Sequence, residues 1–202
     1  MAEASSIREE RKVVTVVFAD LVGSTPLAER LDPEEVRLIV SEAVARIVQA
    51  IEGFGGTIKD LAGDGVLALF GAPITHEDDA ERAVRAALAI VREIDEYASE
   101  VAKGWGVEGF AARVGVHSGP VVLGPIQTSG RVELGAYGDT VNTAARLQAA
   151  AQPGTVLVGA STHALWVSVS TPSDEEAKRA EGRLREWGAR SVARVDDEES
   201  AS

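Results

Sequence analysis

The chain has 202 residues, of which 45% are hydrophobic, and 32 acidic against 20 basic residues give it a formal net charge of -12. This length suits one folded domain with tails, and the acidic balance argues against electrostatic binding to nucleic acid or to an anionic membrane. The absence of cysteine excludes disulfides. Because the sequence has no long apolar run, it predicts neither a membrane span nor a signal peptide. We therefore expect a cytoplasmic protein.

The first predicted strand covers residues 12 to 19 and leads into an acidic residue. Valine and threonine dominate this run, and a small-residue turn stops it, so we expect Asp20 at the end of a strand. Ser24 or Thr25 followed by Pro26 then indicates the start of a helix. The turn after Asp20 would therefore present backbone N–H groups at a helix N-terminus, where phosphate binds favourably.

A long helix and a hairpin come next. Apolar residues recur at intervals of three and four from Asp32 onward, which is typical of an amphipathic helix. The apolar runs 57–61 and 66–70 then flank Ala62-Gly63-Asp64-Gly65, a pattern that predicts a hairpin with Asp64 at its tip.

The second half of the chain predicts further helices and strands. A second amphipathic helix begins near residue 77, and residues 98–108 are expected to form a loop or a frayed helix end. The remaining expected elements are strands at 110–117, 121–123 and 131–134, a helix from about 139 to 151, a strand at 155–158 and a short helix at 160–165. This order predicts an α/β sandwich, with an antiparallel-rich sheet and helices on one main face.

The two ends of the chain are expected to lie outside the folded domain. We assign residues 1–10 to a flexible N-terminal segment and 11–169 to the domain itself. The low apolar content of residues 170–183 predicts a mobile polar linker. Residues 184–202 are expected to hold a last edge strand near 191–195 and an acidic tail.

Two pairs of side chains carry candidate chemistry. Carboxylates at neighbouring strand ends, Asp20 and Asp64, could share Mg²⁺ ions that stabilise the oxygens of an in-line phosphoryl displacement. Asp also favours turns for local reasons, so either residue alone has an ordinary structural explanation. Asn142 and Arg146 stand at i and i+4 of a predicted helix and project from one face, with groups suited to a sugar hydroxyl and a phosphate. An Asn and an Arg at this spacing are also common on a solvated surface.

Four motifs in a fixed order give these pairs a common context. They are Phe18-Ala19-Asp20-Leu21-Val22-Gly23-Ser24-Thr25, Gly63-Asp64-Gly65, Arg113-Val114-Gly115-Val116-His117-Ser118-Gly119, and Gly138-Asp139-Thr140-Val141-Asn142-Thr143-Ala144-Ala145-Arg146. Over about residues 11 to 166, the chain resembles the class III nucleotidyl cyclase catalytic domains. The resemblance implies a ferredoxin-like-related fold, an antiparallel-rich sheet flanked by helices. It also implies conversion of a nucleoside triphosphate to a 3′,5′-cyclic monophosphate and pyrophosphate.

The resemblance also implies a role for each matching position. Two Mg²⁺ or Mn²⁺ ions would be held by Asp20 and Asp64, assisted by the backbone carbonyl of Leu21. Arg113 would meet the phosphates, together with the segment Val22, Gly23, Ser24 and Thr25 that the predicted helix start already indicates. Asn142 would orient the ribose, and Arg146 would stabilise charge in the transition state. No protein base is required, so we expect His117 to be packed in a turn rather than catalytic.

Two positions depart from the family pattern, and both concern the base of the nucleotide. The lysine expected four residues before the second metal aspartate is here Asp60, and Lys59 stands one residue too early. Strand alternation would turn Lys59 to the opposite face unless a bulge restores it. The aspartate or threonine expected seven residues before Asn142 is here Gly135. ATP is the expected substrate from its frequency in the family, and GTP and pyrimidine triphosphates remain open.

In this family the metal aspartates and the Asn/Arg helix face each other across a dimer. The resemblance therefore implies a homodimer with two composite sites. The basic start of the chain at Arg8, Arg11 and Lys12 and its expected mobile end suggest a catalytic module of a longer protein with regulatory domains. Two other readings remain. One is a catalytically silent domain that binds nucleotide and dimerises, for which Asp60 and Gly135 leave room. The other is a noncyclising polymerase-like domain, which would not explain the Asn142/Arg146 helix.

Overall fold

The computed structural model describes residues 9–128, 131–163 and 194–195. Its elements are β1 (Glu10–Val22), α1 (Ser24–Arg30), α2 (Pro33–Gly53), β2 (Thr57–Ala62), β3 (Gly65–Phe70), α3 (Asp79–Trp105), β4 (Ala111–Thr128), β5 (Arg131–Tyr137), α4 (Asp139–Ala150), β6 (Thr155–Gly159) and β7 (Arg194–Val195). Residues 160–163 are helical. The predicted linker 170–183, residues 1–8 and nearly all of 184–202 lie outside the described residues.

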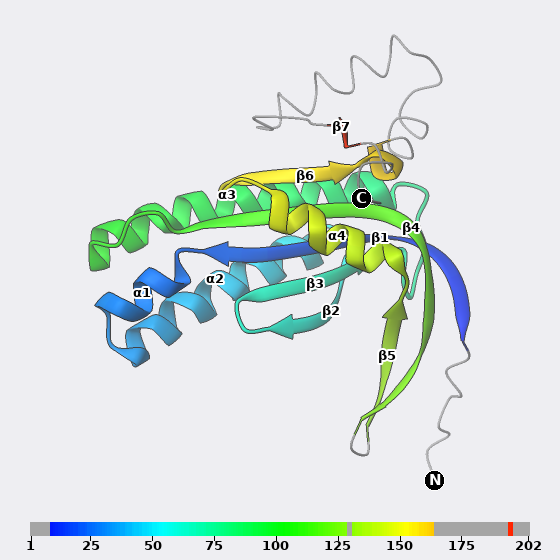
Figure 1. The fold of residues 1–202 in the computed structure, drawn as a ribbon, viewed down its shortest axis with the longest axis horizontal. Coiled ribbons are helices and arrows are strands. Elements are labelled where there is room, and N and C mark those ends of the chain that lie inside the picture. The colour runs from blue at the N-terminus through cyan, green and yellow to red at the C-terminus, as the bar shows by residue number, and fades with distance from the viewer. Residues whose placement is uncertain (1–8, 129–130, 164–193, 196–202) are drawn as a thin grey trace.

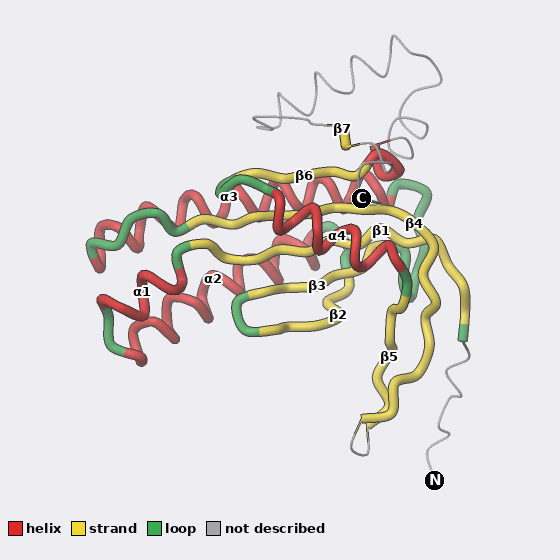
Figure 2. The backbone as a smooth tube through the Cα atoms, in the orientation of Figure 1, coloured by secondary structure: helices red, strands yellow, loops and turns green. Residues whose placement is uncertain are grey.

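The strands form one sheet, seen from its α4 side in Figure 1. Its order is β2-β3-β1-β4-β6-β7, and β5 pairs with β4 outside this row. The pairs among β1 to β5 are antiparallel, and the β4–β6 and β6–β7 pairs are parallel. The prediction of an antiparallel-rich sheet flanked by helices is therefore confirmed. Figure 2 shows β4 and β5 running together past the body of the sheet as an arm.

Helices cover the two faces of the sheet unequally. The main core lies between the sheet and the α2–α3 pair, where Ile39, Ile47, Ile90 and Ile94 are fully buried. A smaller cluster on the opposite face joins Ala144 of α4 to β1, β3 and β4, and leaves Phe18 and Leu67 only partly buried. The expectation of helices on one main face is thus wrong for α4 (Figure 1).

The prediction that Asp20 stands at the end of its strand is wrong, because Asp20 lies inside β1. β4 begins at Ala111 and continues to pair with β1 as far as Val22, so the strand extends beyond the predicted residues 12–19. On the other side of β1, the pairing with β3 ends at Ala19. Asp20 is therefore the first residue after the β1–β3 pairing ends, and its strand neighbour lies on the β4 side only.

Several other boundaries differ from the predictions. β5 continues to Tyr137 instead of ending at Leu134. β4 runs without a break through 118–120, where a turn was expected. α3 continues to Trp105 through the expected loop at 98–108, because the core still buries Tyr97 and Val101. α1 has Gly23 as its N-cap, so Pro26 is the third helical residue rather than the first. The hairpin of β2 and β3 and the start of α2 at Asp32 are as predicted.

Candidate functional site

The β1–β3 pairing brings Asp20 beside the turn that carries Asp64. Since Ala19 pairs with Val66, the next residue of β1 lies beside Gly65. A Cβ atom built on Gly65 would lie 3.8 Å from Asp20 Oδ1, so this oxygen faces the turn. Asp64 is half-buried and makes no hydrogen bond or ion pair with the described residues. The two carboxylate-bearing segments predicted to meet therefore do so.

The second oxygen of Asp20 accepts two hydrogen bonds. Arg113, its register partner on β4, donates from Nη2 to Asp20 Oδ2 at 2.9 Å, and Gln148 of α4 donates from Nε2 to the same oxygen at 3.2 Å. The side chains of Asp20 and Arg113 are 27% and 30% exposed. Arg113 Nε is buried and has no partner among the described residues. A guanidinium has five N–H donors, so Arg113 keeps donor capacity for an anionic ligand.

Sequence reasoning missed Gln148. The residue is 8% exposed and shares the buried face of α4 with Thr140, Ala144 and Leu147. A glutamine on an otherwise mostly apolar stripe was the signal, because a buried amide needs a hydrogen-bond partner.

Gly115 explains how α4 comes so close to the sheet. A Cβ atom at this position of β4 would collide with the backbone of Ala144 and Gln148. The missing side chain lets the helix backbone rest directly on the strand, one pleat from Arg113. Gly115 therefore sets the height of Gln148 above the sheet.

Asn142 and Arg146 lie on the exposed side of the same helix. Arg146 Nη2 donates to Thr143 Oγ1 at 3.0 Å and lies 3.5 Å from Asp139 Oδ1, both within α4. Asn142 has no hydrogen-bond partner among the described residues, and no hydrogen bond or ion pair joins either side chain to Asp20 or Asp64. One chain thus gathers Asp20, Asp64 and Arg113, and leaves Asn142 and Arg146 facing outward.

The residues around Asp20 fit a hard divalent cation as a partial ligand set. The described residues contain no group of three or more His, Cys, Asp or Glu side chains placed to hold a metal. Asp20 Oδ1 and the Asp64 carboxylate nevertheless have no protein partner in the described structure, and carboxylate oxygens are what Mg²⁺ and Mn²⁺ prefer. Further ligands would have to come from backbone carbonyls, water or substrate phosphates, as is usual for Mg²⁺ sites.

The predicted phosphate-binding segment follows directly. Val22 ends β1, and Gly23 adopts φ 92° before Ser24 and Thr25 open α1. A side chain at Gly23 would press on the backbone of Gly109 and Phe110, so glycine is required on two grounds. Leu21 is buried on the core side of β1.

Among the predicted base-reading positions, Lys59 lies at a bulge of β2, which is the irregularity that would turn its side chain away from the face set by strand alternation. Ile58 pairs with Ala68 and Asp60 pairs with Leu67, so Lys59 is an extra residue in β2. Lys59 is half-buried, whereas Asp60 is exposed and its Oδ1 accepts a hydrogen bond from the N–H of Leu61 at 2.9 Å. A bulge re-aims a side chain, so simple alternation no longer assigns Lys59 to the core face. Gly135 is buried in β5, where it pairs with Gly124.

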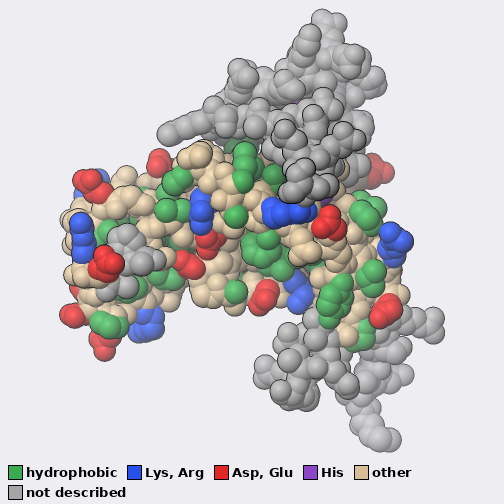
Figure 3. All heavy atoms as spheres, in the orientation of Figure 1, with side chains coloured by type: hydrophobic (Ala, Val, Ile, Leu, Met, Phe, Trp, Pro, Cys, Tyr) green, Lys and Arg blue, Asp and Glu red, His purple; other side chains and the backbone are tan. Residues whose placement is uncertain are grey.

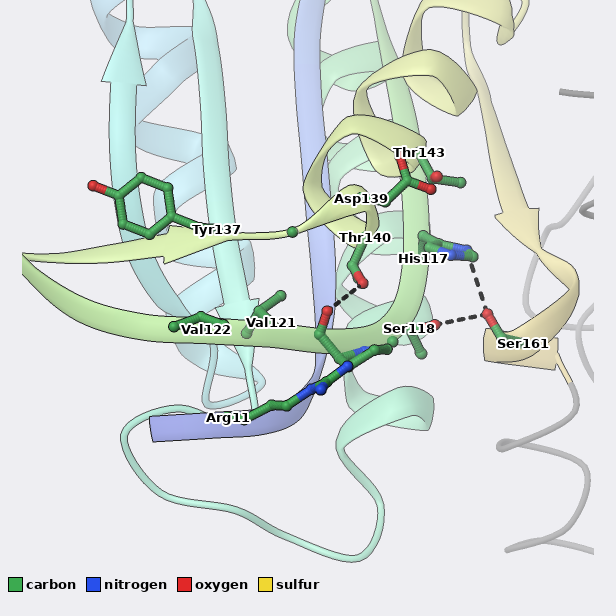
Figure 4. A pocket seen from close by; sticks show the side chains of 13 residues that line it. Arg11, His117, Ser118, Val121, Val122, Tyr137, Asp139, Thr140, Thr143 and Ser161 are labelled. Atoms are coloured by element: carbon green, nitrogen blue, oxygen red, sulfur yellow. Dashed lines mark hydrogen bonds between the residues drawn. The ribbon is translucent and has the colours of Figure 1, made fainter. Parts of the chain in front are cut away.

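A pocket of about 760 Å³ lies at the N-terminus of α4, and none of the predicted site residues lines it (Figure 4). Around it, Thr140 Oγ1 donates to the carbonyl of Pro120 at 2.8 Å, and Ser161 Oγ donates to that of Ser118 at 2.7 Å. His117 is buried here, with its Nδ1 3.4 Å from Ser161 Oγ. These contacts agree with a packed histidine.

Comparison with known proteins assigns the chain to a family. The family model described as the adenylate and guanylate cyclase catalytic domain matches residues 7–187, so the chain belongs to this family. Adenylate cyclase 1 of Rhizobium meliloti (strain 1021) is 35% identical over 138 residues, which are 68% of this chain and 21% of that protein. The chain thus spans about a fifth of that relative.

Solved structures of the family share the fold. The guanylyl cyclase Cya2 superimposes with a TM-score of 0.72 at 32% identity, covering 78% of this chain and 79% of the other. The adenylyl cyclase CyaB from P. aeruginosa gives 0.76 at 27% identity, covering 80% and 83%. The class III cyclase fold predicted from the motifs is therefore confirmed.

Two surface features complete the description. None of the described helices combines the length and the apolar character needed to cross a bilayer. Acidic and basic side chains are interspersed over the described surface visible in Figure 3.

Proposed function

We propose that the chain converts a nucleoside triphosphate, most favourably ATP, to a 3′,5′-cyclic monophosphate and pyrophosphate. One observation carries the proposal: Asp20 presents a free oxygen to the turn that bears Asp64, while Arg113 is fixed at the same place. Carboxylates and a guanidinium that converge where the β1–β3 pairing ends are the groups that phosphoryl transfer requires. Family membership supports the same reaction.

Each residue has a separate task in the proposed reaction. Asp20 and Asp64 would hold two Mg²⁺ or Mn²⁺ ions, which when bound supply activation of the ribose 3′ hydroxyl and neutralisation of phosphate charge. Backbone groups from Leu21 to Thr25 and the side chain of Arg113 would orient the triphosphate. Asn142 would fix the ribose, and Arg146 would meet the charge that develops on the oxygens around the α-phosphorus.

The site requires two chains. Asn142 and Arg146 face away from Asp20 and Asp64 in one chain, and the α4 side of the sheet leaves Phe18 and Leu67 only partly covered. A two-fold homodimer would place α4 of each chain opposite the metal aspartates of the other and create two equivalent sites.

For the base, we propose that Lys59 acts as the reading side chain. The bulge in β2 supports this assignment, because it supplies the extra residue that the sequence offset of Lys59 requires. Gly135 offers no side chain as a partner, so discrimination between ATP and GTP should be weaker than two reading residues would give.

The test is turnover of ATP, GTP, CTP and UTP with Mn²⁺ at high protein concentration. We expect a cyclic product, with ATP preferred, and a loss of about 100-fold or more in Asp64→Ala, because the variant lacks one of two metal carboxylates. A second candidate, a silent nucleotide-binding domain, is favoured by the exposed Asp60 and by Gly135 at the base positions. Nucleotide binding without cyclic product from any triphosphate would decide for that candidate.

A further inference from the structure

The carboxylate of Asp20 uses its two oxygens differently. Both hydrogen bonds that it accepts, from Arg113 and from Gln148, end on Oδ2. Oδ1 accepts none in the described structure and faces the turn of Asp64. The carboxylate is therefore held in one rotation, with one oxygen committed to the protein and one directed to the place where a cation would sit.

Of the two donors, Gln148 is the one with no other assigned task. Arg113 is expected to contact substrate, whereas Gln148 is buried in α4 and, among the described residues, its amide donates a hydrogen bond to Asp20 alone. The position of Gln148 is fixed by the sheet, because the helix backbone at Ala144 and Gln148 packs directly against Gly115 of β4. A buried amide anchored in this way gives Asp20 a donor that substrate binding does not remove.

We propose that Gln148 is a positioning residue, which holds Asp20 Oδ2 so that Oδ1 stays directed at the cation site. The inference rests on the proposed function, and it assigns to this chain a residue outside the motifs that define the family resemblance. Groups that orient metal ligands in this way commonly change metal affinity or activity by about 10- to 100-fold when they are removed.

The two sides of α4 would thus serve different active sites of the dimer. Asn142 and Arg146 on its outer side would serve the site built on the partner chain, whereas Gln148 on its inner side serves Asp20 of its own chain. Gln148 must therefore act in cis, while Asn142 and Arg146 act in trans.

The first test measures the cation directly. Gln148→Met keeps the length and nearly the volume of the side chain but removes its N–H donors, and Gln152→Met is the matched control because Gln152 is exposed just beyond the same helix. Mn²⁺ binding is titrated by electron paramagnetic resonance of free Mn²⁺, with Asp64→Ala to define binding at the site. We expect Gln148→Met to bind Mn²⁺ roughly 10-fold more weakly and Gln152→Met to bind like the wild type.

Thermal unfolding of each variant separates positioning from folding. If Gln148→Met does not fold, Gln148→Asn replaces it, since its shorter amide cannot reach Asp20 and the same weakening is expected. Equal Mn²⁺ affinities of the wild type and the folded variant would overturn the inference alone. A wild type without Asp64-dependent Mn²⁺ binding would overturn the metal site of the proposed function together with the inference.

The second test places the substitution on one chain at a time. In a mixture of Asp20→Ala and Arg146→Ala chains, the single intact site takes Asp20 from the Arg146→Ala chain. Adding Gln148→Met to that chain should raise the Mn²⁺ concentration for half-maximal rate by roughly 10-fold, and adding it to the Asp20→Ala chain should leave it unchanged. An effect only from the Asp20→Ala chain would show that Gln148 acts through the position of α4 and would contradict the proposal.

Discussion

Asp20 and Asp64 are chemically alike but lie in different surroundings. Asp20 accepts hydrogen bonds from Arg113 of β4 and Gln148 of α4. Asp64 lies in a turn and has no hydrogen-bond or ion-pair partner in the described structure. The first residue thus contributes to both the stability and the proposed chemistry of the domain, and the second to the chemistry only.

This difference predicts different changes in stability for the same substitution at the two positions. Asp20→Ala should lower the free energy of unfolding by about 1–3 kcal/mol, because it leaves the partly buried donors of Arg113 and Gln148 without an acceptor. Asp64→Ala should change it by no more than about 0.5 kcal/mol. Both variants should lose turnover. Urea unfolding measures the two values, and equal destabilisation would show that the contacts of Asp20 do not stabilise the fold.

Lys59 gives a prediction about selectivity. Lys59→Met should lower kcat/KM for ATP by roughly 10-fold, the effect of one lost hydrogen bond to the base, and should reduce the preference for ATP over GTP. Asp60→Asn, at the adjacent exposed position, serves as the control and should preserve the preference. If the ATP-to-GTP ratio of kcat/KM is the same in Lys59→Met and the wild type, another group reads the base.

At the scale of elements, local patterns predicted most of the fold. The period of α2, the acid-rich start of α3 and the Gly63-Asp64 turn each depend on neighbouring residues, and the structure contains all three. The boundaries that failed depend on distant partners. β1 extends past Asp20 only because β4 continues beside it, and α3 extends to Trp105 because the core buries its last turns.

Pro120 shows why β4 was predicted as two strands. Proline lacks a backbone N–H and usually interrupts pairing inside a sheet. On the side of β4 away from β1, however, pairing with β6 ends at Val116 and pairing with β5 begins at Val122. Pro120 falls in this gap, so the strand runs on without losing a hydrogen bond there. Gln148 was missed for a similar reason, since its contact with Asp20 spans 128 positions of sequence.

Gly115 allows the packing of α4 to be tested. Gly115→Ala should cost about 1–3 kcal/mol of unfolding free energy by overpacking, because the added methyl meets helix backbone rather than a movable side chain. Turnover of the Gly115→Ala variant should also fall, because a displaced α4 would shift Gln148, Asn142 and Arg146. Gly104→Ala in α3 is the control: nothing lies within 4 Å of its added methyl, and it should stabilise the helix by about 0.5 kcal/mol. A Gly115→Ala protein as stable as the wild type would contradict the close packing.

At the scale of the whole molecule, the proposed activity belongs to a pair of chains. Dilution should therefore lower the rate per chain once the concentration falls below the dimer dissociation constant, because mass action separates the halves of each site. Initial rates at saturating triphosphate and Mn²⁺ over a wide range of protein concentration check this. A rate per chain that stays constant while sedimentation shows dissociation to monomers would place the whole site in one chain.

Complementation between two inactive variants tests the shared site most directly. Asp20→Ala and Arg146→Ala proteins should each be inactive, and an equimolar mixture should recover about a quarter of the wild-type rate, because random pairing makes half of the dimers mixed and each mixed dimer has one intact site of two. A mixture that stays inactive while mass spectrometry shows mixed dimers would contradict the account.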